Sequence, residues 1–204
     1  MKVETYPWPH AVVNNYYPKE LFNDMEAELT QFAELQMKQM QDEALDKFTG
    51  YRFNICNIND RQGWKCCNTH KFKLFPKTTK CLKSRSINII DLAYFPNHRK
   101  YDTVDTRTVI TMVFSEDAAS NVIHYDGVDK IFTSVTYVSP IISKGTILYD
   151  MNMKYVKEVE WAPNRALFFA PETDKTWHSY KTLPGCFRIA ITEFIRSTDS
   201  IEPF

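Results

Sequence analysis

The second half of the chain consists of short strand-like segments separated by turn signals, and this pattern constrains the fold more than any other feature. Pairs such as Lys144-Gly145 and Pro184-Gly185 are typical of turns. No helical periodicity lies between the segments, so the series predicts a jelly-roll or cupin-like barrel. The strand-like segments are Thr108–Phe114, Ile131–Val138, Thr146–Tyr149, Tyr155–Trp161, Ala166–Ala170 and Cys186–Ile195.

The first half opens with a predicted helix from about Pro18 to Phe48. Proline suits the first turn of a helix, and Gly50 follows the expected end. We expect this helix to pack on the outer face of the sheet. The segment Ser86–Tyr94 predicts the first strand of that sheet. The apolar residues that recur at helical spacing are Leu21, Phe22, Met25, Leu29, Phe32 and Leu35.

Composition restricts the partners and the compartment. The 204 residues carry no formal net charge at pH 7, so no overall field attracts nucleic acid or a membrane surface. No apolar run approaches the length of a membrane span, and the first residues lack the apolar core of a signal peptide. Five cysteines, an odd number, indicate reduced thiols and predict a cytoplasmic protein.

Three side chains in the second half predict a metal site. His124 and Asp126 are two residues apart, and in a strand such residues project from the same face. A single strand cannot surround a metal, so a third ligand must come from elsewhere, and His178 can provide it. Two imidazoles and one carboxylate can hold one face of an Fe(II) octahedron and leave the opposite positions open. The sequence therefore predicts an oxygen-activating iron enzyme.

Arg188 follows His178 by ten residues, within a strand-like run of aliphatic residues. It shares one face of that strand with Ala190 and Thr192, so the arginine can face a lumen while the other face packs. A buried guanidinium needs an anionic partner. A bound carboxylate suits its planar, forked geometry; the alternative is an internal salt bridge to an aspartate or glutamate.

The order and spacing of these motifs resemble the Fe(II)/2-oxoglutarate-dependent oxygenases, in the prolyl-hydroxylase-like branch. The resemblance implies one domain over 1–204 that is mainly β with an N-terminal helix (α+β). Residues 107–196 would form a double-stranded β-helix core that carries the metal site. Residues 1–106 would form an N-terminal helical and sheet-extension region, with helices packed on one sheet. The matching segments are His124–Gly127, Ser134–Ser139, Gly145–Tyr149, Arg165–Pro171, His178 and Arg188, with a looser match over Tyr6–Val13 and Pro18–Leu21.

The resemblance implies the chemistry of a dioxygenase. The same two histidines and aspartate would hold Fe(II) and act as the catalytic residues. The cosubstrate 2-oxoglutarate would place its distal carboxylate on Arg188, and Tyr137 and Thr192 would add hydroxyl groups to that site. With dioxygen, the reaction would hydroxylate a peptidyl residue or a small molecule and release succinate and carbon dioxide.

Several positions depart from related branches. Ala190 stands where many relatives have Ser or Thr, which implies a different cosubstrate pocket. Phe114 falls near the position of the tyrosine that prolyl hydroxylases use at the 1-carboxylate. Phe194 replaces the second arginine of the nucleic-acid-dealkylating branch, and the presence of Asp126 disfavours halogenation.

The segment from Arg61 to Ile90 leaves another hypothesis open. It contains eight basic residues and no acidic one, interleaved with Trp64, Phe72 and Phe75. Such a surface could bind an anionic partner or single-stranded nucleic acid. The chain would then be a non-enzymatic or cupin-type metal-binding module, unless the segment is simply a solvated loop.

The remaining histidines and cysteines lack the arrangement of a second metal site. Cys66, Cys67, His70 and Cys81 include no C-x-x-C pair, so we interpret the cysteines as buried or partly exposed thiols. No ligand-forming residues accompany His10, His70 or His98, and we expect them to be surface or structural residues.

Overall fold

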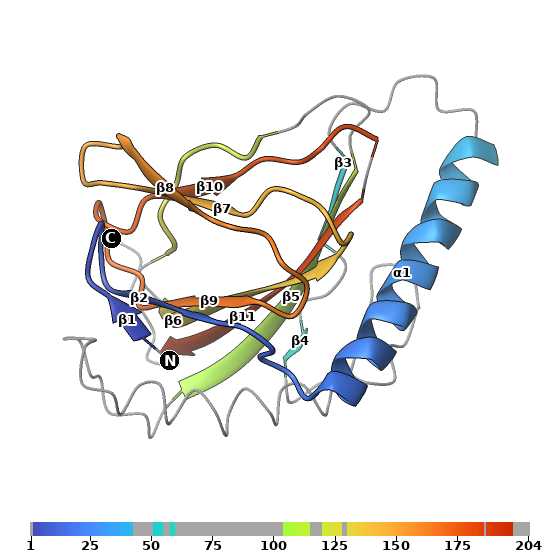
Figure 1. Cartoon of the computed structure of the whole chain (residues 1–204), viewed down its shortest axis with the longest axis horizontal. Helices are drawn as coiled ribbons and strands as arrows, with labels where there is room; N and C mark the ends of the chain where they lie inside the picture. The colour runs from blue at the N-terminus through green and yellow to red at the C-terminus, as the bar shows by residue number, and fades with distance from the viewer. Residues whose placement is uncertain are drawn as a thin grey trace.

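The computed structural model describes residues 2–42, 51–54, 58–59, 104–114, 120–127, 130–185 and 187–197. These residues form two antiparallel sheets and one helix (Figure 1). The predicted class, mainly β with an N-terminal helix, is confirmed. The predicted strand Ser86–Tyr94, the basic segment 61–90 with its cysteines, and His98 lie outside the described residues.

The larger sheet has eight strands. Its order begins with the N-terminal strands β1 and β2, so the start of the chain extends the sheet rather than only leading into it. The strands in spatial order are β1 (Lys2–Glu4), β2 (His10–Val13), β9 (Ala166–Phe169), β6 (Lys130–Ser139), β11 (Arg188–Ser197), β5 (Val104–Phe114) and β3 (Tyr51–Asn54), with β4 (Ile58–Asn59) paired to β5.

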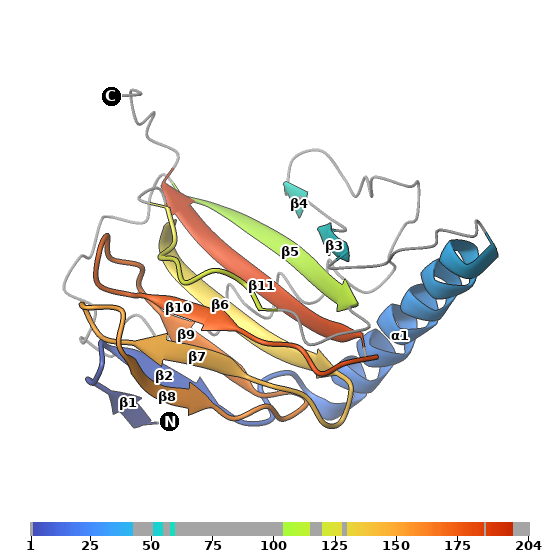
Figure 2. The same cartoon turned by 90° about the horizontal axis from the view of Figure 1, so that it is seen from above.

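The smaller sheet lies across one face of the larger one, as the two views show (Figures 1 and 2). Its order is β10 (His178–Tyr180), β7 (Thr146–Tyr149) and β8 (Tyr155–Val159). Apolar side chains from both sheets and from the connection between β1 and β2 fill part of the space between them. They are Trp8, Tyr137, Leu148, Val159, Leu167 and Phe169.

Helix α1 (Lys19–Asp42) covers the opposite face of the larger sheet. Its buried residues Phe22, Met25, Leu29 and Phe32 recur every three or four positions, as the sequence predicted. Leu35 was predicted to continue this face but is 54% exposed, because the packed stripe ends one turn earlier. The predicted helix end at Phe48 lies outside the described residues.

Strand β9 shows how the alternation of side chains builds both layers. Ala166 and Phe168 face α1, whereas Leu167 and Phe169 face the smaller sheet. All four side chains are completely buried, so this short apolar run is covered on both sides. The same alternation on β11 places Ile189 toward the helix, so the residues on either side of it face the smaller sheet.

The strands predicted between residues 131 and 170 are confirmed as β6 to β9, with ends that differ by two residues or fewer.

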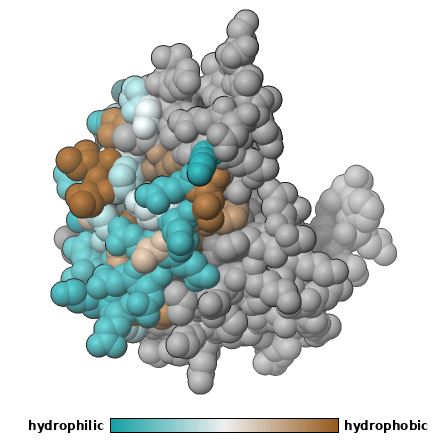
Figure 3. Space-filling view, turned by 90° about the vertical axis from the view of Figure 1, so that its right-hand side faces the viewer, coloured by the Kyte–Doolittle hydropathy of each residue, from teal (hydrophilic) through white to brown (hydrophobic). Residues whose placement is uncertain are grey.

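Figure 3 views the molecule from the side on which α1 lies in Figure 1, and hydrophilic side chains cover much of the described surface there. Ile141 and Ile142 are exposed beside Asn23 and Ala27 of α1, in a groove. Among the described residues, no helix is long and apolar enough to cross a bilayer.

Candidate metal centre and its cavity

His124 and His178 are held opposite each other by two backbone hydrogen bonds. His124 lies in the connection between β5 and β6, and His178 begins β10. The amide of His124 donates to the carbonyl of His178 at 3.0 Å, and the amide of His178 donates to the carbonyl of His124 at 2.8 Å. This pairing places the two ring centroids 4.4 Å apart. Segments far apart in sequence thus present two imidazoles at one point.

A hydrogen bond through Nδ1 orients each imidazole. Nδ1 of His124 lies 2.9 Å from the carbonyl oxygen of Val122, and Nδ1 of His178 lies 2.9 Å from that of Thr176. A carbonyl can only accept, so each Nδ1 carries a proton and Nε2 is the nitrogen left to bind a metal. Burial lowers the pKa of His178 to about 4, so this imidazole is neutral at pH 7.

Asp126 is buried, and each of its oxygens accepts a hydrogen bond. Nζ of Lys130 donates to Oδ1 at 2.6 Å, and Oγ1 of Thr133 donates to Oδ2 at 2.8 Å. Burial opposes ionisation, but the interactions with His178, Lys130 and Thr133 outweigh it and hold the pKa of Asp126 below its ordinary value. The carboxylate is therefore ionised at neutral pH, and each oxygen retains a second lone pair for a cation.

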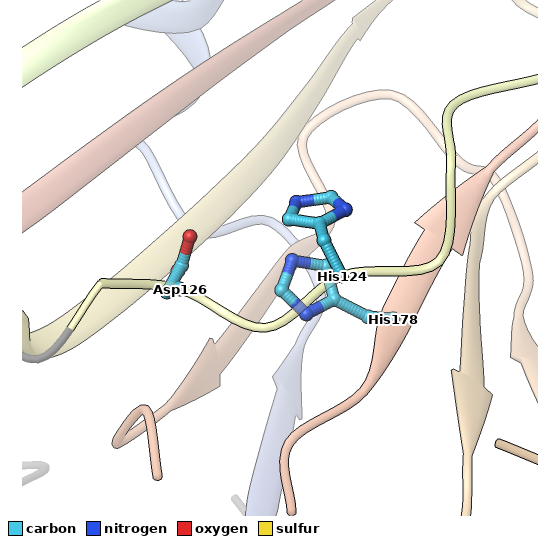
Figure 4. A group of neighbouring side chains, drawn as sticks. All are labelled: His124, Asp126 and His178. Carbon is cyan, nitrogen blue, oxygen red and sulfur yellow. The ribbon is translucent and has the colours of Figure 1, made fainter. Parts of the chain in front are cut away.

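The three side chains lie beside one another, with their potential ligand atoms all within 4.8 Å (Figure 4). Two imidazole nitrogens and one carboxylate oxygen at this separation can meet a single ion. Such a set matches a non-haem Fe(II) centre that leaves coordination positions open. The structure thus brings together the three residues that the sequence predicted as metal ligands; their binding of iron stays a prediction.

The route to this geometry differs from the prediction. Residues 121–127 do not form a continuous strand, because His124 makes only an isolated bridge to His178. The ring of Tyr125 packs edge-on against the ring of Trp177, the residue before His178, with the ring centroids 4.7 Å apart. Tertiary contacts of this kind, rather than a regular strand, fix the positions of His124 and Asp126.

A cavity of about 440 Å³ adjoins the three residues and lies between the two sheets. One wall comes from alternate residues of β11, and Thr133 and Val135 of β6 extend that wall. Thr146 and Tyr180 line the cavity from the smaller sheet. The lining residues of β11 are Arg188, Ala190, Thr192 and Phe194.

Arg188 faces this cavity and is 2% exposed. Its guanidinium carbon lies 4.2 Å from the ring centroid of Tyr180 and 5.1 Å from that of Trp161. Aromatic faces suit the flat, weakly hydrated guanidinium. Tyr180 follows His178 by two residues on β10, a rise of about 7 Å along the strand. The guanidinium therefore lines the same cavity as the three candidate metal ligands.

The two hydroxyl residues predicted for this site occupy different positions. Thr192 lines the cavity. Tyr137 is completely buried behind it, where its hydroxyl donates to Oγ1 of Thr146 and accepts from the Thr146 amide, both at 2.9 Å. Its ring centroid lies 5.8 Å from the guanidinium carbon of Arg188. Tyr137 thus orients Thr146, which itself lines the cavity.

Sequence reasoning missed Lys130, Thr133 and Thr146. Thr133 alternates with Val135 and Tyr137 on β6, so strand periodicity could have placed it on the inner face. No comparable signal marks Lys130, because strand periodicity does not predict its contact with Asp126. His10, predicted to be a surface or structural residue, is completely buried, and its Nδ1 lies 2.7 Å from the carbonyl oxygen of Trp8.

Comparisons with known proteins give matches of fold only. No protein-family model matches the chain, and no curated protein matches its sequence. A prolyl-4-hydroxylase from Pseudomonas putida has a TM-score of 0.56 and 12% identity, covering 92% of each chain. A 2OG-Fe(II) oxygenase family protein from Burkholderia pseudomallei has a TM-score of 0.54 and 11% identity, covering 92% of this chain and 84% of that one.

A third structural relative is a prolyl hydroxylase from Trichoplax adhaerens, in complex with a peptide fragment of hypoxia inducible factor. Its TM-score is 0.53 with 15% identity, and the match covers 92% of this chain and 83% of that one. These likenesses confirm, at the level of the fold, the predicted resemblance to prolyl-hydroxylase-like 2-oxoglutarate oxygenases. Identities this low show the fold alone, so the chemistry has to be argued from the residues of the site.

Proposed function

We propose that this protein is an Fe(II)- and 2-oxoglutarate-dependent dioxygenase, with a double-stranded β-helix core over residues 107–196. One observation carries the proposal. The ligand atoms of His124, Asp126 and His178 lie within 4.8 Å of one another at a cavity that also contains the buried guanidinium of Arg188. Three candidate metal ligands and a cation suited to a carboxylate, in one cavity, are the two parts that such an enzyme needs.

Fe(II), when bound, would supply the activation of dioxygen, and the protein would orient and shield the reacting groups. The donor set fits this ion. His178 is already neutral and Asp126 already ionised at pH 7, so neither has to lose a proton before binding a cation. The Nδ1 hydrogen bonds fix both rings with Nε2 available.

For the cosubstrate 2-oxoglutarate, we propose that Arg188 binds the distal carboxylate. Thr146 and Thr192 line the same cavity and would add hydroxyl donors. Burial raises the pKa of Tyr137, so its hydroxyl stays neutral and keeps Thr146 in place. Ala190, between Arg188 and Thr192, lines the same cavity with a small side chain.

We propose that the reaction hydroxylates a peptidyl residue or a small molecule and releases succinate and carbon dioxide. The Trichoplax relative holds a peptide, which makes short peptides the first substrates to test. The decisive experiment incubates the protein with Fe(II), 2-oxoglutarate and oxygen, and measures succinate by NMR. Succinate above the level without protein would support the dioxygenase. Metal binding without succinate, with or without a peptide pool, would favour a cupin-type metal-binding protein.

Replacing Arg188 with methionine should raise the KM for 2-oxoglutarate roughly a hundredfold, with a smaller effect on kcat. Losing one member of a buried, hydrogen-bonded charge pair typically costs about 2–5 kcal/mol of binding. Initial rates of succinate release over a range of 2-oxoglutarate concentrations would measure the change. Arg165→Met removes an arginine that binds Asn14 and the Glu160 carbonyl instead, and it serves as the control. An unchanged KM in Arg188→Met would show that the distal carboxylate binds elsewhere.

A further inference from the structure

Lys130 places a second positive charge in the cavity, next to a proposed metal ligand. Its Nζ lies 2.6 Å from Oδ1 of Asp126 and 3.8 Å from the ring centroid of Phe194. The side chain is only 21% exposed and lines the same cavity as Arg188. The ammonium is therefore held in place by a carboxylate on one side and an aromatic face on the other.

This contact has an electrostatic consequence for a metal ion. The ammonium of Lys130 cancels the charge of the Asp126 carboxylate, so the pair presents no net charge to a dication. An ion bound by Asp126 would also lie close to Nζ, because both contact the same carboxylate group. Repulsion between like charges at such short range is substantial in a partly buried site. Thr133 donates to the other oxygen of Asp126, and because this hydroxyl is neutral it does not repel the metal ion.

An anion bound beside the metal would make the positive charge of Lys130 favourable rather than unfavourable. A carboxylate in the cavity near Asp126 would be attracted by Lys130 as well as by the dication, and it would offset the repulsion between them. The cavity then contains two separate cations, Arg188 and Lys130, for the two ends of a dicarboxylate.

We propose that Lys130 couples the two binding events: it weakens the binding of a bare divalent metal and strengthens the binding of the anionic end of 2-oxoglutarate to the metal-loaded protein. This inference rests on the proposed function and adds to it the group that receives the metal-proximal carboxylate. The competing explanation is that Lys130 only holds Asp126 in position. If Lys130 had only that role, its loss would weaken metal binding. The coupling role predicts instead that its loss strengthens metal binding.

The test measures binding rather than turnover. Free Mn(II) is followed by EPR to obtain its affinity, and titration with N-oxalylglycine, an unreactive analogue of 2-oxoglutarate, gives the affinity of the anion for the Mn(II)-loaded protein. Lys130→Met should bind Mn(II) about tenfold more tightly and N-oxalylglycine about tenfold more weakly, and Lys130→Arg should stay near wild type in both. Lys157→Met removes a lysine that pairs with Glu4 on β1 and should change neither affinity.

Other results would contradict either the coupling role of Lys130 or the proposed function. Weaker Mn(II) binding by Lys130→Met, or N-oxalylglycine affinity equal to wild type, would overturn the coupling role and leave the proposed enzyme intact. Wild-type protein that binds neither Mn(II) nor N-oxalylglycine would instead refute the proposed function. Lys130→Gln removes the same charge with a polar side chain and replaces the methionine variant if that one does not fold.

Discussion

Replacing Asp126 with alanine is expected to abolish succinate formation and to weaken Mn(II) binding by more than about a hundredfold. Changes to groups that merely orient a metal ligand already cost about 10–100-fold in affinity, and this substitution removes the proposed ligand itself. It also leaves the Lys130 ammonium in the site without the carboxylate that it contacts at 2.6 Å. A dication would then face two imidazoles and an uncompensated positive charge.

His178→Ala should reproduce this loss, because the buried imidazole that it removes is neutral and available to a metal. Glu160→Ala is the matched control, since that carboxylate is 89% exposed and only loosely paired with Arg165. Circular dichroism of each variant would show whether the fold persists. Folded Asp126→Ala protein that still bound Mn(II) with wild-type affinity would contradict the proposed centre.

A second large effect is expected from Glu193, which lies on the helix-facing side of β11. The side chain is completely buried, and burial raises the pKa of Glu193 to about 8. The hydroxyl of Tyr17 donates to Oε2 at 2.9 Å, whereas Oε1 has no hydrogen-bond partner among the described residues. The folded protein therefore keeps this carboxyl protonated at neutral pH, although the unfolded chain would ionise it.

Stability should fall as the pH rises from about 4.5 to about 8. Over this range the folded state holds a proton that the unfolded state has lost, so each pH unit costs the folded state about 1.4 kcal/mol and the whole range roughly 5 kcal/mol. Glu193→Gln cannot ionise and should escape this cost. Its free energy of unfolding should match wild type near pH 4.5 and exceed it by several kcal/mol at pH 8.5.

Urea unfolding of both proteins at several pH values would measure the difference. Glu160→Gln provides the control for loss of a glutamate charge at an exposed position, and its difference from wild type should vary little with pH. A Glu193→Gln variant whose advantage over wild type stayed constant between pH 4.5 and 8.5 would show that Glu193 ionises normally in the folded state.

Much of the scaffold could be predicted because local patterns govern it. The spacing of Phe22, Met25 and Leu29 predicted the buried face of α1, and alternation along β11 correctly placed Arg188 and Thr192 on one face. The point at which the buried face of α1 ends was harder to predict from the sequence. Leu35 fits the periodicity, yet its burial depends on whether the sheet extends far enough to cover it.

The sequence by itself determined which side chains can form the centre. Two histidines, one aspartate and an arginine ten residues after the second histidine are chemically suited to a metal and a carboxylate wherever they lie. Only the tertiary structure decided how they meet. The paired backbone hydrogen bonds between His124 and His178 join segments far apart in the sequence, and the Lys130 cation beside Asp126 belongs to no repeating pattern. Periodicity carries no information about such contacts, because it describes how neighbouring residues share a face and not which segments fold against each other.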